Sequence, residues 1–374
     1  MRNVFDPSFG NRPDCIVGRD EVLAGVDRGL AARPGSRDRA MLITGQRGMG
    51  KTALLLEIET RAQSAGFVTA RAAANERMLD NLIERLQVNG RAVVDNGKKR
   101  VRGVSAGAFG FSLGLTFSEE VRDNYGFQTK LSLLCDRLAE YGRGVLILLD
   151  EVRSTFPEMR VLADAYQQLV GDGKDIAICM AGLPSSISSV LNDKVLTFLN
   201  RAKKIHLEKL PLPPVRAYYA RTFDEAGLML QPRALERAVT ATDGFPYLLQ
   251  LIGYYIIEEA NDGALADDEL LDRALADARN DMEDNVFRPL LSELSATDKE
   301  FLKALAHVAD KDGTGRVGNV TARLGKSNGY VQVYRKRLLD AGAIVSPRDG
   351  ELEFAVPLLR EYLAGDALSY IGVG

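Results

Sequence analysis

Cysteine and histidine are scarce in this chain of 374 residues, which has three cysteines and two histidines. The cysteines Cys15, Cys135 and Cys179 are far apart and odd in number. Even with His206 and His307 included, they offer neither a disulfide framework nor a zinc site. We therefore expect the thiols to be buried in the folded protein.

Long apolar segments are also missing. The longest apolar run, residues 247–257, is interrupted by Gln250 and is too short to span a bilayer. Residues 1–10 do not resemble a signal peptide. The net charge is only −3, and we find no internal repeat or low-complexity segment. These absences predict a cytoplasmic protein without a membrane partner, and the chain length predicts two or three domains.

The most informative segment that is present, residues 40–52, places a glycine-rich loop between an apolar strand and a helix. Glycines let backbone N–H groups curl around an anionic oxygen, and the following helix N-terminus attracts the same charge. Lys51 can reach the β- and γ-phosphates of a nucleotide, and the Thr52 hydroxyl can bind Mg²⁺. The predicted nucleotide-binding residues are Gly45, Gln46, Arg47, Gly48, Met49, Gly50, Lys51 and Thr52. The alternative is a glycine-rich turn that binds nothing.

A second motif follows about a hundred residues later, where the apolar run 145–149 ends in Asp150 and Glu151. Hydrolysis of a nucleotide needs the metal to be held from a second side and a water to be polarised in line with the γ-phosphate. Asp150 is expected to lie near the Mg²⁺, and Glu151 to orient or deprotonate the attacking water. Taken alone, the pair could be an ordinary charge pair at a helix N-terminus.

Residues 1–230 read as alternating strands and helices, which predicts an α/β core with a parallel sheet covered on both faces. The apolar runs 41–43, 145–149 and 176–180 are its expected buried strands. Residues 98–118 break this rhythm, because their apolar positions alternate with small residues, and they predict a β-hairpin insertion. The basic start of that insertion is either a solvated charge run or a nucleic-acid contact.

The remainder of the chain divides into two parts. Residues 231–285 have a helical pattern and thirteen acidic residues against four arginines, so they predict a small helical lid that repels phosphate backbones. Residues 286–374 predict three short helices followed by two strands, 343–346 and 352–356. That order is typical of a winged helix-turn-helix.

One segment of the predicted winged helix is rich in basic residues. Residues 314–348 contain seven basic residues and a single acid, Asp340. Ser327 or Asn328 can cap the third helix and direct its first turns at base edges, with basic residues further along for phosphates. The predicted DNA-binding residues are Asn328, Tyr330, Gln332, Tyr334, Arg335, Lys336, Arg337 and Arg348. Winged helices also bind proteins or form fixed parts of a lid, so this alternative stays open.

The motifs together resemble the AAA+ P-loop ATPases of the archaeal-type and STAND branches, which are relatives of the origin-recognition initiators. The resemblance rests on residues 16–21, 45–52, 148–151 and 244–246, and it covers essentially the whole chain. It implies that ATP is the nucleotide and Mg²⁺ the metal. It also implies that Ile16 and Val17 lie along the adenine, and that the segment Gly244-Phe245-Pro246 closes the lid over the nucleotide.

The resemblance implies one further catalytic residue, and the chain departs from the family pattern at two positions. Arg201 stands where AAA+ proteins carry the arginine that reaches a neighbouring subunit's γ-phosphate. Residues 180–182 lack the polar residue that usually senses this phosphate, which Ser185 and Ser186 could replace, and residues 243–247 lack a lid arginine. We therefore expect an ATPase with slow turnover.

The sequence as a whole predicts an ATP-binding AAA+ switch whose nucleotide state positions a winged helix on DNA. The alternative is a STAND-type signalling scaffold whose winged helix binds a protein. The expected partners are ATP or ADP and DNA, with a second copy of the chain or another protein as further candidates.

Overall fold

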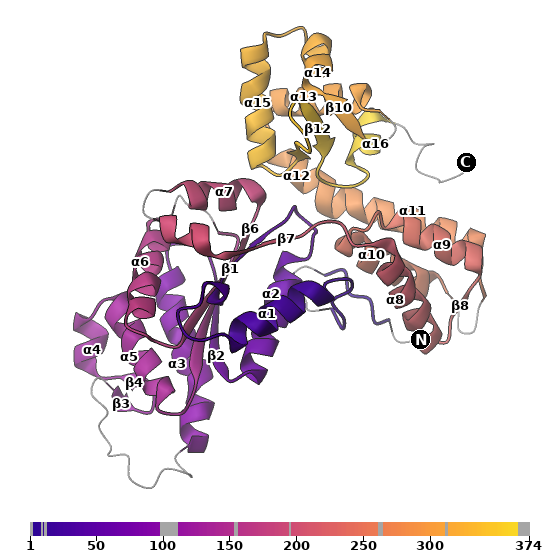
Figure 1. Cartoon of the computed structure of the whole chain (residues 1–374). Helices are drawn as coiled ribbons and strands as arrows, with labels where there is room; N and C mark the ends of the chain where they lie inside the picture. Colours follow the sequence, from indigo (N-terminus) through magenta and orange to yellow (C-terminus); the bar gives the residue numbers. More distant parts are fainter. Residues whose placement is uncertain are drawn as a thin grey trace. The chain divides into compact units, whose positions relative to one another are not determined.

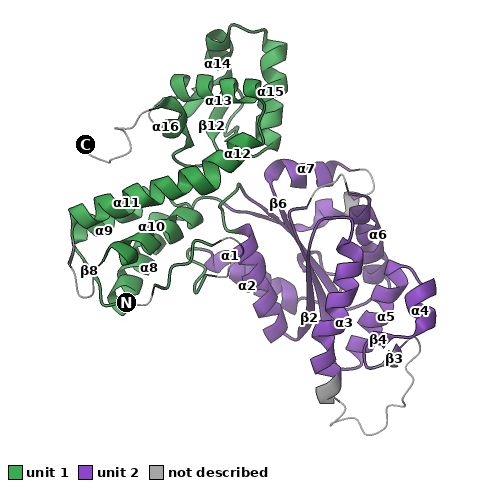
Figure 2. Ribbon diagram, turned by 180° about the vertical axis from the view of Figure 1, so that it is seen from behind, with its two compact units in different colours: residues 1–18, 46–50, 208–374 green, residues 19–45, 51–207 purple. Residues whose placement is uncertain are grey.

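The chain forms two compact units (Figure 2). The sheet unit comprises Arg19–Gly45 and Lys51–Leu207, and the C-terminal unit comprises Met1–Gly18, Gln46–Gly50 and Glu208–Gly374. The computed structural model describes residues 3–8, 10, 13–97, 111–152, 156–193, 196–260, 265–310 and 313–365.

A parallel sheet of five strands, in the order β2-β5-β6-β1-β7, forms the centre of the sheet unit (Figure 1). Its strands are β1 (Ala40–Thr44), β2 (Phe67–Ala73), β5 (Gly144–Asp150), β6 (Ile176–Gly182) and β7 (Lys203–His206). All residues of β6 are buried, and so are all residues of β5 before Asp150. Continuous apolar strands of this kind need cover on both faces. The predicted parallel α/β core is confirmed, and the three predicted strands lie within β1, β5 and β6.

Helices cover the sheet, and alternate residues of each strand point to opposite faces. Val145, Ile147 and Leu149 share one apolar core with residues of α3, α5 and α6. Leu146 and Leu148 are equally buried and point to the other face, and α2 packs against β2, β5 and β6. The helices are α1 (Asp20–Ala31), α2 (Lys51–Ser64), α3 (Met78–Gly97), α4 (Glu119–Asn124), α5 (Phe127–Ala139), α6 (Pro157–Gly171) and α7 (Pro184–Asn192), with short 3₁₀ turns η1 (Arg37–Arg39) and η2 (Thr197–Arg201).

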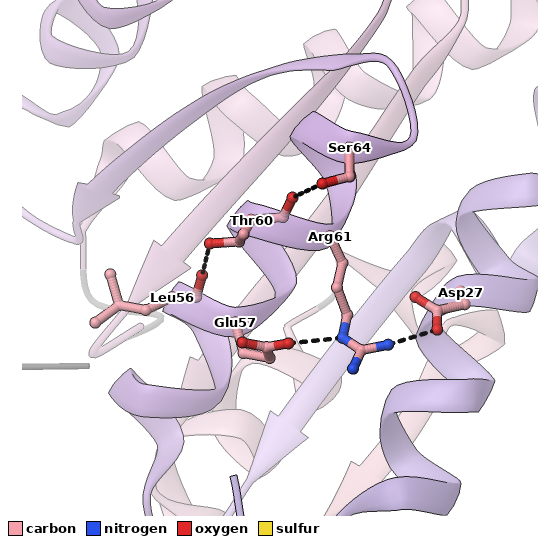
Figure 3. Close-up of polar contacts among 6 residues, drawn as sticks. All are labelled: Asp27, Leu56, Glu57, Thr60, Arg61 and Ser64. Atoms are coloured by element: carbon pink, nitrogen blue, oxygen red, sulfur yellow. Dashed lines mark hydrogen bonds and ion pairs between the residues drawn. The ribbon is translucent and has the colours of Figure 1, made fainter. Parts of the chain in front are cut away.

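An arginine ties α2 to α1 (Figure 3). The guanidinium of Arg61 donates to Asp27 Oδ2 at 2.7 Å and to Glu57 Oε1 at 2.8 Å. The hydrogen bond to Glu57 is the main cause that raises the pKa of Arg61. Such charge-assisted hydrogen bonds are stronger than neutral ones and orient the partners. Because α2 begins at Lys51, this contact helps to fix the helix that carries the first predicted phosphate-binding side chains.

The predicted hairpin insertion is described only in part. Residues 98–110 lie outside the described residues. Beyond them, β3 (Phe111–Leu113) pairs antiparallel with β4 (Thr116–Phe117), and the rings of Phe111 and Phe117 stack with their centroids 5.3 Å apart. Leu115, between the two strands, is fully buried in the core of the sheet unit.

The three cysteines are free thiols. Cys135 and Cys179 are buried, as predicted, whereas Cys15 is half-buried. Burial raises the pKa of the Cys135 thiol to about 12, and it raises the pKa of Cys179 as well. Both buried thiols are therefore protonated near neutral pH and are poor nucleophiles.

The C-terminal unit begins with a bundle of helices, to which the N-terminal segment is added. Phe5 is 2% exposed, and its ring lies 5.4–5.8 Å from those of Tyr218, Tyr219 and Phe223. Gly253 makes room for it, because a Cβ there would lie 2.4 Å from the Phe5 ring. The bundle consists of α8 (Leu212–Glu225), α9 (Pro232–Ala241), α10 (Pro246–Glu259) and α11 (Asp268–Met282), with the short parallel strands β8 (Met229–Leu230) and β9 (Leu265–Ala266).

The helix α11 continues through a π-helical turn, η3 (Glu283–Phe287), into α12 (Arg288–Ser292). The helix α8 precedes residue 230, the predicted end of the ATP-binding core, yet it belongs to the C-terminal unit. The predicted boundaries at residues 230 and 285 stay predictions.

A helical region with a small antiparallel sheet completes the C-terminal unit. It contains α13 (Ala296–Val308), β10 (Thr314–Arg316), α14 (Val317–Leu324), α15 (Asn328–Asp340), β11 (Ile344–Val345), β12 (Glu351–Phe354) and α16 (Leu359–Ala364). The strands pair in the order β10-β12-β11, so the sheet has one strand more than the predicted hairpin. Gly325, with φ +62°, ends α14, and the Ser327 hydroxyl caps α15 by accepting from the Tyr330 N–H.

Within the described ranges, none of the helices combines the length and the apolar character that a bilayer crossing requires.

Candidate functional site

The loop between β1 and α2 has the backbone that the sequence predicts for a phosphate cradle. Gly48 and Gly50 both have φ +78°, a left-handed conformation that residues with a Cβ rarely adopt. In the sheet unit, the ammonium of Lys51 donates to the carbonyl oxygen of Gly45 at 2.9 Å. The lysine is half-buried, and its contact ties the first turn of α2 to the end of β1.

The predicted metal-binding side chains meet in the sheet unit. The hydroxyl of Thr52, in the first turn of α2, donates to Asp150 Oδ2 at 2.7 Å, although 98 positions separate the two residues. The other carboxylate oxygen of Asp150 accepts from the backbone N–H of Glu151 at 2.9 Å. A hydroxyl and a carboxylate are hard oxygen donors, which fit Mg²⁺. The pair could therefore hold Mg²⁺ from two sides, as the sequence predicts.

Glu151 follows the last residue of β5 in a strained conformation. Its φ is +54°, a left-handed value that costs about 1–2 kcal/mol for a residue other than glycine. Its side chain is exposed. A strained residue beside a predicted metal ligand is typical of a position that function retains against the preference of the backbone. A carboxylate here can act as a general base once a substrate water is within reach.

The end of β6, where the sequence predicts no polar sensor, is closely packed. Gly182 packs so closely on Val152 that a Cβ at this position would lie 2.9 Å from the valine side chain. The carbonyl of Ala181 accepts from the Val152 N–H at 3.0 Å. No larger polar residue fits at the end of this strand without a shift. Ser185 and Ser186, the suggested substitutes, are half-buried in the first turn of α7.

Arg201 is the last residue of η2, in the sheet unit, and its side chain is exposed. That position is accessible to another molecule, which is what a residue acting on a neighbouring copy requires. Its predicted role stays a prediction.

The predicted adenine-side residues belong to the C-terminal unit. Ile16 and Val17 are half-buried and precede Gly18, which has φ +64°. A Cβ on Gly18 would lie 3.5–3.7 Å from side chains of Leu210, Pro211 and Pro214. The turn at residues 16–18 therefore packs on the segment that leads into α8.

The segment Gly244-Phe245-Pro246 contacts the glycine-rich loop within the C-terminal unit. A Cβ on Gly48 would lie 3.1 Å from the Phe245 ring, and one on Gly50 would lie 3.7 Å from Pro246. Gly244 has φ +66°, and a Cβ there would lie 2.4 Å from the carbonyl oxygen of Leu210, so only glycine fits. The predicted nucleotide-binding residue Pro246 is thus next to the loop that is predicted to bind phosphate.

Two contacts of this loop region were missed by the sequence analysis. Arg47 pairs with Glu293, which follows α12, at 3.4 Å. Tyr247 packs on Gly48, and burial is the main cause that raises the pKa of its hydroxyl to about 12. Contacts between distant segments leave no local pattern in the sequence. The position of Tyr247 directly after Pro246 was the only hint that it lies near the loop.

Five of the eight predicted DNA-binding residues are exposed, namely Asn328, Gln332, Lys336, Arg337 and Arg348. Several of the eight also make side-chain contacts inside the C-terminal unit. The rings of Tyr330 and Tyr334 lie 4.7 Å apart, Arg335 donates to the Ser346 hydroxyl at 3.0 Å, and Arg337 pairs with Asp298 at 2.9 Å.

The ion pair of Arg337 reaches an almost completely buried carboxylate. Asp298 is 1% exposed and also accepts from the N–H and the hydroxyl of Ser295, the capping residue of α13. The guanidinium of Arg337 is half-exposed, so solvent screens part of the attraction. The contact nevertheless joins α15 to the start of α13 and gives Arg337 a role in stability.

We expect Arg337→Ala to lower the free energy of unfolding by about 1–2 kcal/mol, because it removes one partner of a buried carboxylate that keeps its two bonds from Ser295. Lys336→Ala is the matched control, because it removes the same charge from the neighbouring, exposed position and should change stability by less than about 0.5 kcal/mol. Urea unfolding of both variants measures the difference. Equal stabilities would mean that the pair with Asp298 contributes nothing.

Comparisons with known proteins support the fold. Residues 284–363 match the family described as "Domain of unknown function (DUF8462)". A comparison with curated proteins found no match. Among solved structures, the chain is similar to the Walker-type ATPase of Pyrococcus abyssi, with 17% identity, coverage of 96% of this chain and 99% of that chain, and a TM-score of 0.66. It is also similar to the ORC2 protein of Aeropyrum pernix in its ADP form, with 16% identity, coverage of 97% and 98%, and a TM-score of 0.54.

At such low identities these similarities define the fold. The chain has the fold of Walker-type, AAA+-like P-loop ATPases over nearly its whole length. The resemblance that the sequence motifs indicated is confirmed at this level.

Proposed function

We propose that this chain is an ATP-binding, Mg²⁺-dependent ATPase of slow turnover, whose nucleotide state controls a winged helix on DNA. The observation that carries the ATPase part is the hydrogen bond between Thr52 and Asp150, together with the lysine at the start of α2. This bond brings two hard oxygen donors together near the start of α2, which supports a shared Mg²⁺ site beside Lys51.

Each residue of the proposed site has one task. Backbone N–H groups of residues 45–50 and the Lys51 ammonium bind the phosphates. Thr52 and Asp150 hold Mg²⁺, which neutralises charge that develops on the phosphates. Glu151 orients or deprotonates the water that attacks the γ-phosphate. By resemblance, Ile16 and Val17 contact the adenine, and Arg201 acts on the nucleotide of a neighbouring copy.

The proposal of slow turnover rests on the packing at the end of β6. The close packing of Gly182 on Val152 excludes a larger polar side chain at the strand end where a γ-phosphate sensor is expected. A long-lived ATP state suits a switch better than a motor.

The route from nucleotide to winged helix lies within the C-terminal unit. Phe245 and Pro246 pack on Gly48 and Gly50, and Pro246 is the first residue of α10. The chain then runs through α11 and the π-helical turn η3 to α12 and the winged helix. A loop that tightens around phosphates therefore acts directly on the residues that lead into this path. π-Helical turns inside helices are frequent at functional positions.

DNA is the proposed partner because residues 314–348 expose six basic side chains and one acidic side chain, Asp340. Arg323, Lys336 and Arg348 are exposed, and no ion pair of theirs is present among the residues that the structure describes. Exposed cations of this kind attract a phosphate backbone and make the affinity dependent on salt.

Reciprocal coupling between the two ligands tests the proposal. We expect ATP and ADP to give different affinities for duplex DNA, and saturating DNA to change the ATP affinity by the same factor as ATP changes the DNA affinity. Typical coupling of about 1–3 kcal/mol corresponds to roughly 5- to 150-fold. Calorimetric titration of ATP with and without a mixed-sequence duplex of about 30 base pairs measures it.

The double variant Arg323→Ala/Lys336→Ala is the matched control, because it removes exposed charge while Arg335 and Arg337 keep their internal contacts. It should weaken DNA binding and abolish the effect of DNA on ATP, with ATP affinity alone unchanged. Equal ATP affinities with and without DNA in the unmodified protein would contradict the DNA switch. That result would favour the scaffold whose winged helix binds a protein.

A further inference from the structure

The helices α9, α10 and α11 of the C-terminal unit pack on one another (Figure 1) and surround an open cavity of about 350 Å³. In α9 the lining positions run from Arg233 to Ala241 at the spacing of one helix face. The volume lies within the range of roughly 300–1,000 Å³ that is typical of small-molecule sites. Of the described residues that line the cavity, none belongs to the predicted nucleotide site, so the cavity is a separate feature.

The interior of the cavity is apolar. Leu248 and Ile252 of α10 and Ala278 of α11 line it and are only 1–3% exposed. Leu275 of α11 and Leu358, which precedes α16, add half-buried apolar side chains. An apolar lining gives water few hydrogen-bond partners, so an apolar ligand gains free energy when it displaces that water.

Leu358 contributes to the cavity from a strained backbone. Its φ is +66°, a left-handed value that costs about 1–2 kcal/mol for a residue other than glycine. Its side chain nevertheless forms part of the cavity wall. Strain of this kind persists where the surrounding structure enforces it, and it is frequent at ligand sites. The strained leucine is therefore a second observation, besides the volume, that indicates a binding site.

Most charged side chains that line the cavity are cationic. Among the described lining residues, Arg233, Arg237 and Arg279 stand against a single acid, Glu236. Glu236 is already paired with Arg216 of α8, which does not line the cavity. A cavity with this surplus attracts an anion more than a cation.

The arginines have donors left for a ligand. Arg237 donates to Asp268 Oδ1 at 2.7 Å and to Asp272 Oδ1 at 2.5 Å, which uses two of the five N–H donors of a guanidinium. Arg233 is 81% exposed and lies 3.6 Å from Asp268, too far for a hydrogen bond. With these two aspartates and Arg216 included, four arginines still stand against three acids. Guanidinium groups bind carboxylates through two parallel hydrogen bonds.

We propose that this cavity binds a small amphipathic carboxylate, with its apolar chain against Leu248, Ile252 and Ala278 and its carboxylate at Arg233 and Arg237. The chain gains by leaving water, and the charge stays at the exposed arginines, so no unpaired charge is buried. The site is independent of the proposed ATPase and DNA functions, because it shares no residue with either.

Three amphiphiles with the same chain test the charge preference. Decanoate, decanol and decylammonium are titrated into the full chain by calorimetry, below the concentrations at which they aggregate. We expect decanoate to bind with a Kd below about 1 mM and at least about 10-fold more tightly than decanol. Decylammonium should bind more weakly than decanol. Equal affinities for decanoate and decanol would overturn the proposal, since the arginines would then select nothing.

A larger side chain inside the cavity tests the location. Ala278→Leu fills part of the cavity, so it should lower the affinity for decanoate by at least about 10-fold while the melting temperature stays unchanged or rises. Ala276→Leu is the matched control, because this exposed alanine of α11 does not line the cavity. If Ala278→Leu binds decanoate as the unmodified protein does, the ligand binds elsewhere and the proposal is wrong.

A ratio of two affinities keeps the test decisive even if Ala278→Leu does not fold. Arg233→Ala should lower the affinity for decanoate by about two- to fivefold and leave that for decanol unchanged, because the arginine is exposed and contacts only the charged group. Arg221→Ala, at an exposed position of α8 outside the cavity, should change neither affinity. A decanoate-to-decanol ratio in Arg233→Ala equal to that of the unmodified protein would contradict the proposed carboxylate contact.

Discussion

Lys51→Ala is expected to lower the affinity for ATP by at least about 100-fold while the protein stays folded. Truncating one partner of a hydrogen-bonded charge pair that is buried in a complex typically costs about 2–5 kcal/mol, and about 3 kcal/mol corresponds to this factor. The lysine is half-buried at the start of α2, and its ammonium already points back along the loop to the Gly45 carbonyl at 2.9 Å. Calorimetric titration with ATP and Mg²⁺ measures the loss.

A matched control for Lys51 lies elsewhere in the sheet unit. Lys174→Ala removes the same charge from a pair with Asp136, and it should leave ATP affinity unchanged. The circular dichroism of both variants should equal that of the unmodified protein, because the Lys51 side chain does not belong to the apolar core. An ATP affinity within about threefold of the original would sink the proposal that this loop binds the nucleotide.

Glu151→Gln is expected to leave ATP bound and to lower the rate of hydrolysis by roughly 10²- to 10⁴-fold, the range that a general base contributes. The amide has nearly the shape of the carboxylate but cannot accept the proton of the attacking water. Phosphate release in a single turnover measures the rate, and titration measures the affinity. Glu84→Gln, at an exposed position of α3, controls for the loss of one negative charge.

The strained backbone of Glu151 allows a second, independent variant. Glu151→Gly should raise the free energy of unfolding by about 1 kcal/mol, because glycine adopts φ +54° without a Cβ penalty, and it should abolish hydrolysis as well. Gain of stability with loss of activity marks a residue that function retains. If either variant hydrolyses ATP at the original rate, Glu151 has only a structural role.

The core of the candidate site could be predicted from the sequence because its signals are local. Residues 45–52 are contiguous, and their glycines indicate a left-handed loop backbone, which Gly48 and Gly50 adopt. Asp150 ends a short, apolar and partly β-branched run, a pattern that favours a buried strand. The break between α14 and α15 was likewise predictable, because Gly325 and Ser327 act within one turn of the helix ends.

The assignment of single residues on α15 could not be made in this way. The basic triplet at residues 335–337 looks uniform in the sequence, yet successive helical residues point about 100° apart. Arg335 is directed to Ser346, Arg337 to Asp298, and Lys336 to solvent. The charge pattern of the sequence does not show which of these cations forms an ion pair with a buried carboxylate. Residues 311–316 gave no strand signal either, because a strand of three residues, such as β10, is defined by its pairing with β12.

The sequence by itself determined the fold class, because the glycine-rich loop, the carboxylates after a buried strand and the parallel α/β core all depend on residues that are neighbours in the chain. Only the tertiary structure decided which distant groups meet. The pair of Arg47 with Glu293, the hydrogen bond from Arg335 to Ser346 and the pair of Arg337 with Asp298 join residues that the sequence did not connect. Such contacts depend on the order of strands and the angles between helices, which no local pattern encodes. Chain neighbours impose their geometry through short-range sterics, whereas distant pairs form only when the whole core has packed.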